Sequence, residues 1–443
     1  IRFFETQNGD STQLNCYVML TKSKHKSISF ELEGTNSAGD LGAAASVSFQ
    51  HRNLFRGSET FMIKFRGAYE AISGLQPGYK NHNYTEYGVE TSINFPNFLF
   101  PFLTYDFKRR IKATTEFGLQ YNYQLRPEFS RTIASASWSY KWMQKQKIQH
   151  RIDLLDISYL YLPWISSQFQ EDYINKDKDN YILKYNYENR LIVRMGYNYS
   201  YNSAGGALVN NTITTNSYSI RAGFESAGNI LYGISKMINM RKNKDGEYAI
   251  LGIPYAQYLK GDFDFAKNII IDHRNSLAFH AGIGIAVPYG NAKVVPFEKR
   301  YFSGGANSVR GWSVRNLGPG SFAGDGNFMN QSGDIKLDAS IEYRTRLFWK
   351  FRGAAFIDAG NIWTIREYEN QPGGVFEFDK FYKQIAVAYG LGLRLDLDFF
   401  VLRFDGGMKA INPKYKKAKE RYPIIHPRFS RDFAFHFAVG YPF

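Results

Sequence analysis

The stretch Ile335–Leu347, IKLDASIEYRTRL, decides the class of fold. Its odd-numbered positions are mostly apolar, whereas the even-numbered positions from Lys336 to Arg346 are all polar or charged. Alternation with a period of two over this length is typical of a β-strand whose two faces meet different surroundings. The stretch therefore predicts a strand with one apolar face and one charged face.

The same pattern continues in the stretches that follow, where charges of opposite sign share one face. These pairs are Arg352 with Asp358, Arg394 with Asp396, and Arg403 with Asp405. In a soluble sandwich such faces would simply meet solvent. Here the opposite faces, as at alternate positions of Ile385–Leu397, are apolar enough to meet lipid, which would leave the charges to line a lumen.

The composition agrees with a transmembrane β-barrel. The chain has 443 residues, 32 Tyr, 37 Phe and 39 Gly, and its mean hydropathy is −0.39. It contains no run of 18 apolar residues, which excludes helical membrane spans. A large soluble all-β protein would have a similar composition and mean hydropathy. The alternation within strands and the residues at the chain ends therefore distinguish a transmembrane barrel from a soluble protein.

The alternating segments predict an all-β fold, an antiparallel transmembrane barrel of about 16 strands that occupies residues 27–443. The expected strands are Ser27–Gly34, Leu41–His51, Glu59–Glu70, Tyr84–Phe95, Lys112–Tyr123, Thr132–Trp142, His150–Tyr161, Tyr181–Tyr201, Ser217–Ser226, Tyr248–Phe265, Ile271–Val287, Asp334–Leu347, Phe351–Trp363, Gln384–Asp396, Phe399–Ala410 and Asp432–Phe443.

The last expected strand carries its large apolar side chains on one face. They are Phe433, Phe435, Phe437, Val439, Tyr441 and Phe443. A final strand that ends on an aromatic residue resembles the C-terminal signal by which outer-membrane barrels are recognised. We therefore expect the outer membrane of a Gram-negative bacterium as the location.

The N-terminal residues 1–26 differ from the rest. Leu14–Thr21 alternates like a strand and precedes a basic linker, which predicts the end of a separate domain and a longer chain before Ile1. The single cysteine, Cys16, cannot form an intramolecular disulfide. The net charge of +15 is scattered and forms no stripe, so we expect an anionic membrane surface and no nucleic acid as a partner.

The strand pattern stops between Pro288 and Gly333, in a glycine-rich stretch that contains Tyr301–Asn316, YFSGGANSVRGWSVRN. A loop of this length is usually functional or disordered, and the aromatic residues here argue against disorder. We expect residues 288–333 to fold back into the lumen. Arg310 at the tip would then need carboxylate partners on the wall.

Several of these motifs together resemble the BamA/TamA superfamily of outer-membrane assembly and translocation barrels, the bacterial surface antigen family, and most of all its TamL-type branch. The motifs are His51–Gly57, Val309-Arg310-Gly311-Trp312, Phe356–Gly360, Gly390–Arg394, Arg403-Phe404-Asp405 and the terminal Phe443.

The resemblance implies a sixteen-stranded barrel preceded by periplasmic POTRA domains, of which residues 1–26 would be the tail of the last. It also implies that Arg310 pairs with a lumen carboxylate. Asp358 is the first candidate, and Glu342 and Asp396 come next. Gly311 would permit a tight turn beside the arginine.

For the mechanism, the resemblance points to a lateral seam between the first and last strands. Ser27–Gly34 looks short and Gly440 should weaken the last strand, so the seam should open and accept a substrate strand. The expected seam residues are Ser27, Ser29, Glu31, Phe433, Phe435, Phe437, Gly440 and Phe443. The expected partners are outer-membrane lipid, substrate outer-membrane or surface proteins, and accessory periplasmic, inner-membrane or lipoprotein subunits, with no cofactor and no metal.

The alternative functions are a secretion pore, a passive porin and a barrel enzyme. A two-partner-secretion pore would share the arginine loop, while a passive porin is disfavoured because the loop would plug it. A barrel enzyme such as a phospholipase or protease is also disfavoured, because the eight histidines form no H-E-x-x-H motif and no G-x-S-x-G motif occurs. We therefore expect no enzymatic activity.

Overall fold

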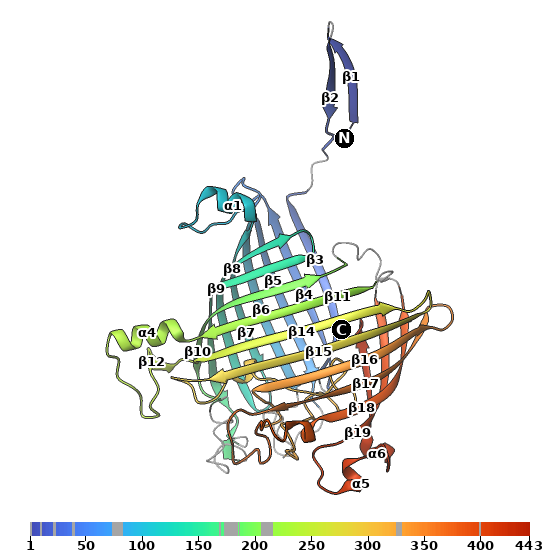
Figure 1. The fold of residues 1–443 in the computed structure, drawn as a ribbon. Coiled ribbons are helices and arrows are strands. Elements are labelled where there is room, and N and C mark those ends of the chain that lie inside the picture. The colour runs from blue at the N-terminus through green and yellow to red at the C-terminus, as the bar shows by residue number, and fades with distance from the viewer. Residues whose placement is uncertain are drawn as a thin grey trace.

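A computed structural model describes residues 2–8, 11–20, 24–37, 40–72, 83–167, 170–171, 185, 187–204, 216–324, 330–397 and 400–443. Its main feature is a 16-stranded antiparallel sheet in which every strand pairs with its neighbours along the chain, from β3 to β20. The sheet curls into a barrel (Figure 1). The predicted fold class and strand number are therefore confirmed.

The barrel strands are β3 (Lys26–Ser37), β4 (Asp40–Arg52), β5 (Thr60–Ala71), β6 (Asn83–Phe95), β7 (Thr114–Leu125), β8 (Phe129–Gln144), β9 (Ile148–Ile165), β10 (Arg190–Asn202), β11 (Ser217–Ala227), β14 (Tyr258–Ile270), β15 (Asn275–Pro288), β16 (Ile335–Arg346), β17 (Phe351–Trp363), β18 (Ala386–Asp396), β19 (Val401–Ile411) and β20 (Phe433–Val439). The smaller elements are β1 (Arg2–Asn8), β2 (Ser11–Tyr17), β12 (Ala249–Ile250), β13 (Ile253–Pro254), α1 (Tyr105–Ile111), α4 (Asn229–Met237), α5 (Ala418–Arg421), α6 (Phe429–Asp432), η3 (Phe297–Lys299) and η4 (Phe381–Gln384).

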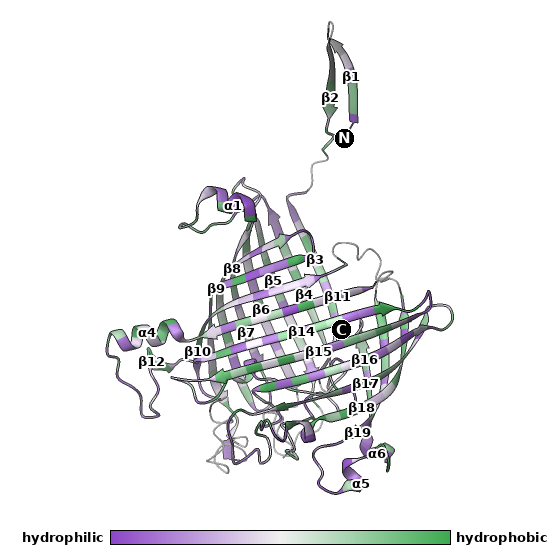
Figure 2. Ribbon diagram, in the orientation of Figure 1, coloured by the Kyte–Doolittle hydropathy of each residue, from purple (hydrophilic) through white to green (hydrophobic). Residues whose placement is uncertain are grey.

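The sheet exposes apolar side chains on its outer face and buries charged side chains on its inner face, which is the opposite of a soluble protein. On β16, Ile341 is 47% exposed whereas Glu342 is fully buried, and on β18, Leu391 is 72% exposed whereas Arg394 is fully buried. Apolar and polar residues alternate along the strands in the same way (Figure 2). An exposed apolar face with buried charges behind it is stable only where the outer surface meets lipid.

The two rims of the barrel differ in the length of their connections. Four short turns, residues 145–147, 271–274, 347–350 and 397–400, lie on the rim from which β3 starts, together with the longer connection that carries α1. Most of the long connections, such as residues 228–257, 289–334 and 412–432, lie on the other rim. Because outer-membrane barrels have short periplasmic turns and long extracellular loops, the second rim faces outward. Among the described residues, no helix has the length and apolar character needed to cross a bilayer.

The N-terminal residues form a small hairpin in which β1 pairs with β2. It stands beyond the periplasmic rim and apart from the sheet (Figure 1). The strand expected over Leu14–Thr21 begins earlier and ends at Tyr17. A two-stranded hairpin does not by itself define a POTRA domain, so that assignment stays a prediction.

β3 and β20 are the two edges of the sheet, and among the described residues neither pairs with another strand on its free side. The prediction of a short first strand is wrong, because β3 has 12 residues. The last strand is the short one, with 7 residues. Gly440 ends it with φ = 85°, a conformation that favours glycine.

Beyond Gly440 the chain turns into the lumen, which corrects the prediction that Tyr441 and Phe443 continue the lipid-facing row. The ring of Phe443 stacks on His280 of β15 with centroids 5.1 Å apart, and the guanidinium of Arg344 lies 4.5 Å from the centre of the Tyr441 ring. The rings of Tyr441 and Phe443 therefore pack against polar side chains inside the barrel and do not face lipid.

Two strands begin much later than predicted. The strand expected over Tyr248–Phe265 starts only at Tyr258, because the small hairpin β12–β13 precedes it. The strand expected over Tyr181–Tyr201 starts at Arg190, and residues 181–184 lie outside the described part of the chain.

Candidate functional site

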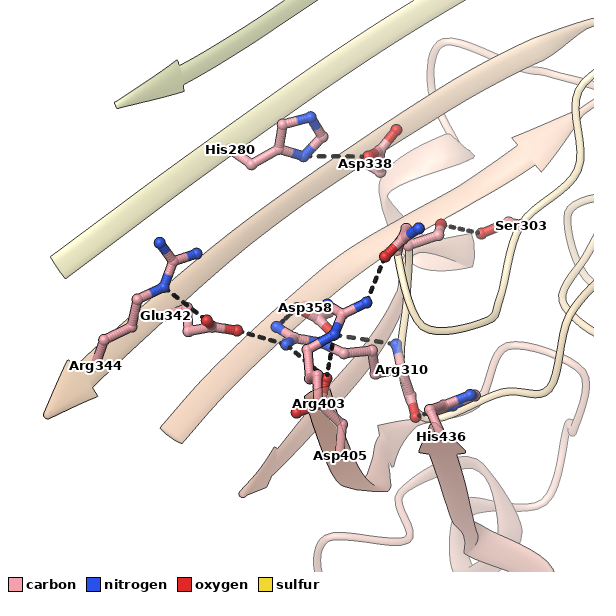
Figure 3. A network of polar contacts seen from close by, with 12 residues as sticks. His280, Ser303, Arg310, Asp338, Glu342, Arg344, Asp358, Arg403, Asp405 and His436 are labelled. Carbon is pink, nitrogen blue, oxygen red and sulfur yellow. Dashed lines mark hydrogen bonds and ion pairs between the residues drawn. The ribbon is translucent and has the colours of Figure 1, made fainter. Parts of the chain in front are cut away.

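The loop between β15 and β16 carries Arg310 at the tip of a compact turn inside the barrel (Figure 3). Gly304 and Gly305 have φ values of 93° and 98°, which let the chain reverse. The turn is closed by the backbone bonds from Gly305 N to Trp312 O, 2.8 Å, and from Trp312 N to Val309 O, 3.2 Å. The tip is therefore a defined structure held by its own backbone.

Arg310 binds Asp358 of β17 through three hydrogen bonds. Its Nε and Nη2 each donate to one carboxylate oxygen at 2.8 Å, and its backbone N–H donates to Oδ2 at 3.0 Å. Both side chains are buried, with Arg310 1% exposed. This two-pronged geometry is the strongest that an arginine and a carboxylate form.

Two further carboxylates share the same guanidinium. Nη1 of Arg310 lies 2.5 Å from Glu342 of β16 and 3.4 Å from Asp405 of β19. Arg394 of β18 bridges these two acids, at 3.0 Å from Glu342 and 2.7 Å from Asp405. The loop tip is thereby tied to four neighbouring strands through one ionic network.

The network keeps Arg310 charged. Burial disfavours the charged guanidinium, but the hydrogen bonds and charge of Asp358, followed by those of Glu342, raise the pKa of Arg310 above its usual value. The guanidinium also lies 3.5 Å from the centre of the Phe356 ring, a favourable cation–π contact.

Glycines let the tip approach the wall. A Cβ at Gly311 would lie 2.8 Å from the Cβ of Ala388, and a Cβ at Gly407 would lie 2.1 Å from the carbonyl oxygen of Arg310. Gly311 lies in the tight turn closed by the bond from Trp312 N to Val309 O, as expected, but its φ is outside the left-handed region, so the turn itself does not require glycine there. The glycine is needed for close packing, and Val309 and Trp312 pack beside it against Ala386 and Ala388.

Replacing Gly407 with alanine is expected to displace the loop tip, because the added methyl group would overlap the backbone of Arg310. Overpacking of this kind costs about 1–3 kcal/mol. The measurement is the rate of limited proteolysis within residues 288–333 of the purified protein. Gly67→Ala on β5, where nothing lies within 4 Å of the added atom, is the matched control and should leave the rate unchanged. Equal rates in the two variants would contradict the packing role.

The carboxylates at Arg310 differ in part from those expected. Asp358 and Glu342 lie at the tip, whereas Asp396 lies at the periplasmic end of β18 and pairs with Arg352. Asp405 takes the third place instead. The position of Asp396 directly before the short turn of residues 397–400 was the available signal, because it places this residue near the rim opposite the loop.

The start of the loop is anchored separately, which the sequence analysis missed. Lys299 lies 2.9 Å from Glu225 of β11, and Tyr301 donates to Asp262 of β14 at 2.6 Å. Glu298 also pairs with Arg131 of β8 at 2.5 Å. In the order of the sheet, β14, β11 and β8 lie two, three and six places beyond β16, so the loop is held by two anchors on different parts of the barrel wall.

A cavity of about 620 Å³ remains between the loop and the wall of β5–β10. Charged residues of both signs line it, among them Glu90, Glu116, Arg151, Arg194 and Lys299. The loop thus divides the lumen and leaves a polar, water-accessible space on one side.

The expected seam residues occupy both faces of the sheet edges. Ser29 Oγ lies 2.7 Å from Ser48 Oγ, and Glu31 accepts a bond of 2.7 Å from Lys64, so both face the lumen, as does Ser27, which donates to Gln50. On β20, Phe435 and Phe437 are exposed on the outer face, at 61% and 51%.

The last strand also contacts the loop tip. Nε2 of His436 lies 3.0 Å from the carbonyl oxygen of Arg310, on the lumen side of β20 (Figure 3). Phe433, expected at the seam, stacks on Phe429 at the extracellular end of the strand. A direct contact therefore joins the ionic network to one edge of the sheet.

These features define a class: a sixteen-stranded barrel of the Gram-negative outer membrane, with a loop fixed in its lumen by a buried arginine. The chain belongs to the Omp85 superfamily, whose domain matches residues 18–443. The recognised resemblance is confirmed at this level, and the TamL-type branch stays a prediction.

Individual proteins are also similar to this chain. A stretch of 97 residues is 32% identical to the outer membrane protein assembly factor BamA of Neisseria meningitidis serogroup B, and covers 20% of this chain and 12% of that protein. The structure of BamA from Haemophilus ducreyi lacking POTRA domains 1–3 matches with a TM-score of 0.58 and 16% identity, over 95% of this chain and 70% of that one. CdiB from Escherichia coli matches with a TM-score of 0.47 and 10% identity, over 99% and 66% of the two chains.

Proposed function

We propose that the protein inserts or assembles other proteins in the outer membrane through the seam between β3 and β20. The observation that carries the proposal is that β3 and β20, the two edges of the sheet, pair with no strand on their outer sides within the described part of the chain. In lipid, unpaired backbone N–H and C=O groups are costly, so a strand that supplies partners for them is strongly favoured. The client would be a β-strand of an outer-membrane or surface protein.

The edge of β3 suits such a client. Its outer face carries Ile28, Phe30 and Leu32, which are 63%, 76% and 88% exposed. Along the edge that does not face β4, its backbone pairs with no described strand. A client strand would gain main-chain hydrogen bonds that demand little of its sequence, with apolar contacts on the lipid face. This generality is what an insertion factor for many different barrels needs.

The arginine network would serve as the scaffold of the seam. Through His436, the loop tip contacts β20, and through Asp358, Glu342 and Asp405 it is tied to β16, β17 and β19. We infer that the network holds the C-terminal side of the barrel rigid while β20 parts from β3.

Translocation through the lumen, as in a two-partner-secretion pore, is the second candidate. The polar cavity of about 620 Å³ favours it. The two anchors of the loop oppose it, because a translocating chain would have to release at least one of them. Accessory periplasmic or lipoprotein subunits are compatible with either function.

The test is depletion of the full-length protein in its own cell, followed by quantitative proteomics of the outer membrane. With insertion as the function, many other barrel proteins should fall in abundance together, and wild-type protein should restore them. A loss confined to one secreted protein would favour translocation, and an unchanged outer-membrane proteome would contradict both functions.

A further inference from the structure

The extracellular connection from β19 to β20 carries a dense cluster of positive charge. Between Lys414 and Arg431 the sequence has seven lysines and arginines and one acidic residue, Glu420. The segment includes α5 and α6 and projects from the outward-facing rim at the end of β19 (Figure 1). The cluster is therefore local, unlike the scattered charge of the rest of the chain.

Part of this charge is used within the protein. Arg431 pairs with Asp432 through two bonds of 2.8 Å, and Arg421 donates to the carbonyl oxygen of Lys383 at 2.6 Å. In contrast, no ion pair with any described carboxylate is formed by Lys417, Lys419 or Arg428.

These three cations surround an open cleft of about 560 Å³. Glu420 is the one carboxylate in its lining, which also includes His426 and Arg431. Clefts of this size are typical of sites that hold a small molecule or a headgroup. Three free cations in one cleft favour a ligand that carries more than one negative charge.

Apolar side chains stand next to the cleft. Ile424, Ile425 and Phe429 are 56%, 68% and 68% exposed, and the lipid-facing row of β20 begins a few residues further on, with Phe435. Exposed apolar residues beside basic ones, on a segment that leads into a lipid-facing strand, are typical of a membrane interface. A soluble anion would use the charges and leave these apolar side chains in water.

We propose that this cleft, which we call the basic rim cleft, binds the phosphorylated headgroup of a saccharolipid in the outer leaflet. Lys417, Lys419 and Arg428 would hold its phosphates, and Ile424, Ile425 and Phe429 would contact its acyl chains. The bound lipid would lie at the extracellular end of β20, one of the two edges of the sheet. The lipid site needs only the barrel and its orientation, and not the proposed insertion activity.

The experiment measures binding of two lipids to the purified protein in detergent micelles by native mass spectrometry. The probes are bis-phosphorylated lipid A and the same lipid with both phosphates removed. Wild-type protein is expected to bind the phosphorylated form about tenfold more tightly. The triple variant Lys417→Gln, Lys419→Gln, Arg428→Gln should lose this preference.

A matched variant controls for net charge. Arg241→Gln, Lys242→Gln, Lys244→Gln removes three charges from the loop that carries α4, on the same rim, and should keep the preference. Equal binding of the two lipids by wild-type protein would overturn the proposal, as would an equal loss in both variants. Displacement of the lipid by millimolar inorganic phosphate would also overturn it, because the site would then bind free phosphate.

Discussion

Replacing Arg310 with alanine is expected to lower the free energy of unfolding of the barrel by about 3–5 kcal/mol, the cost of leaving one partner of a buried ion pair behind. Asp358 is the residue left behind. It is fully buried, and the described contacts give it no other cation, whereas Glu342 and Asp405 both keep Arg394. The measurement is urea unfolding of the purified barrel in lipid or detergent, followed by tryptophan fluorescence.

The control is Arg221→Ala, which breaks the ion pair between Arg221 of β11 and Asp264 of β14. The side chain of Arg221 is 61% exposed and Asp264 keeps its contact with His280, so the loss should be about 0–1 kcal/mol. The double variant Arg310→Ala, Asp358→Ala should be less damaging than the two single changes added together, because no buried charge is then left alone. Equal effects of Arg310→Ala and Arg221→Ala would show that the network does not stabilise the barrel.

A disulfide across the seam is expected to abolish insertion of client barrels, because it would hold β20 beside β3 and close the edge of β3 to a client strand. Two pairs are tested, because the register of a closed seam is not fixed by the open edges: Ser29→Cys with Ala434→Cys, and Ser29→Cys with Ala438→Cys. Ser29 faces the lumen, and both alanines are on the same face of β20 as His436. The native Cys16 is exposed and has to be replaced with serine first. The assay is insertion of a client barrel into proteoliposomes that contain the oxidised protein.

The control disulfide joins two strands that already pair. Ser135 and Ser158 are opposite each other on β8 and β9, with their Oγ atoms 3.1 Å apart, so cysteines there should leave insertion intact. A reductant should restore insertion in the seam-locked protein. Full activity of the oxidised seam lock would reject the lateral mechanism and leave passage through the lumen.

The barrel could be predicted from sequence because lipid imposes a simple rule on each strand. In Ile335–Leu347 one face must be apolar and the other polar, and this alternation was readable without knowing any partner strand. The connections obey no such rule. The prediction merged the hairpin β12–β13 with the following strand, because the hairpin is too short to show a periodic pattern. The inward turn after β20 depends on the positive φ of Gly440, which alternation does not reveal.

The candidate site was only partly predictable. Arg310 and Asp358 stood out because each belongs to a recognised motif, but the choice among Glu342, Asp396 and Asp405 depends on where each residue lies along the barrel axis. Alternation shows which face of the strand a residue is on, but not its position along the barrel axis. The anchors at Lys299 and Tyr301 were missed for a related reason, since they join the loop to strands distant in sequence.

The unequal lengths of β3 and β20 affect how fast a client strand could replace β20 at the edge of β3. β3 has 12 residues and β20 has 7, so 12 − 7 leaves at least five positions of β3 that β20 cannot cover in any register. Even with the seam closed and β20 paired to β3, these positions would remain open to an incoming strand. A client strand could begin to pair there and then displace β20 one hydrogen bond at a time, so the remaining edge of β3 need not be exposed to lipid at once.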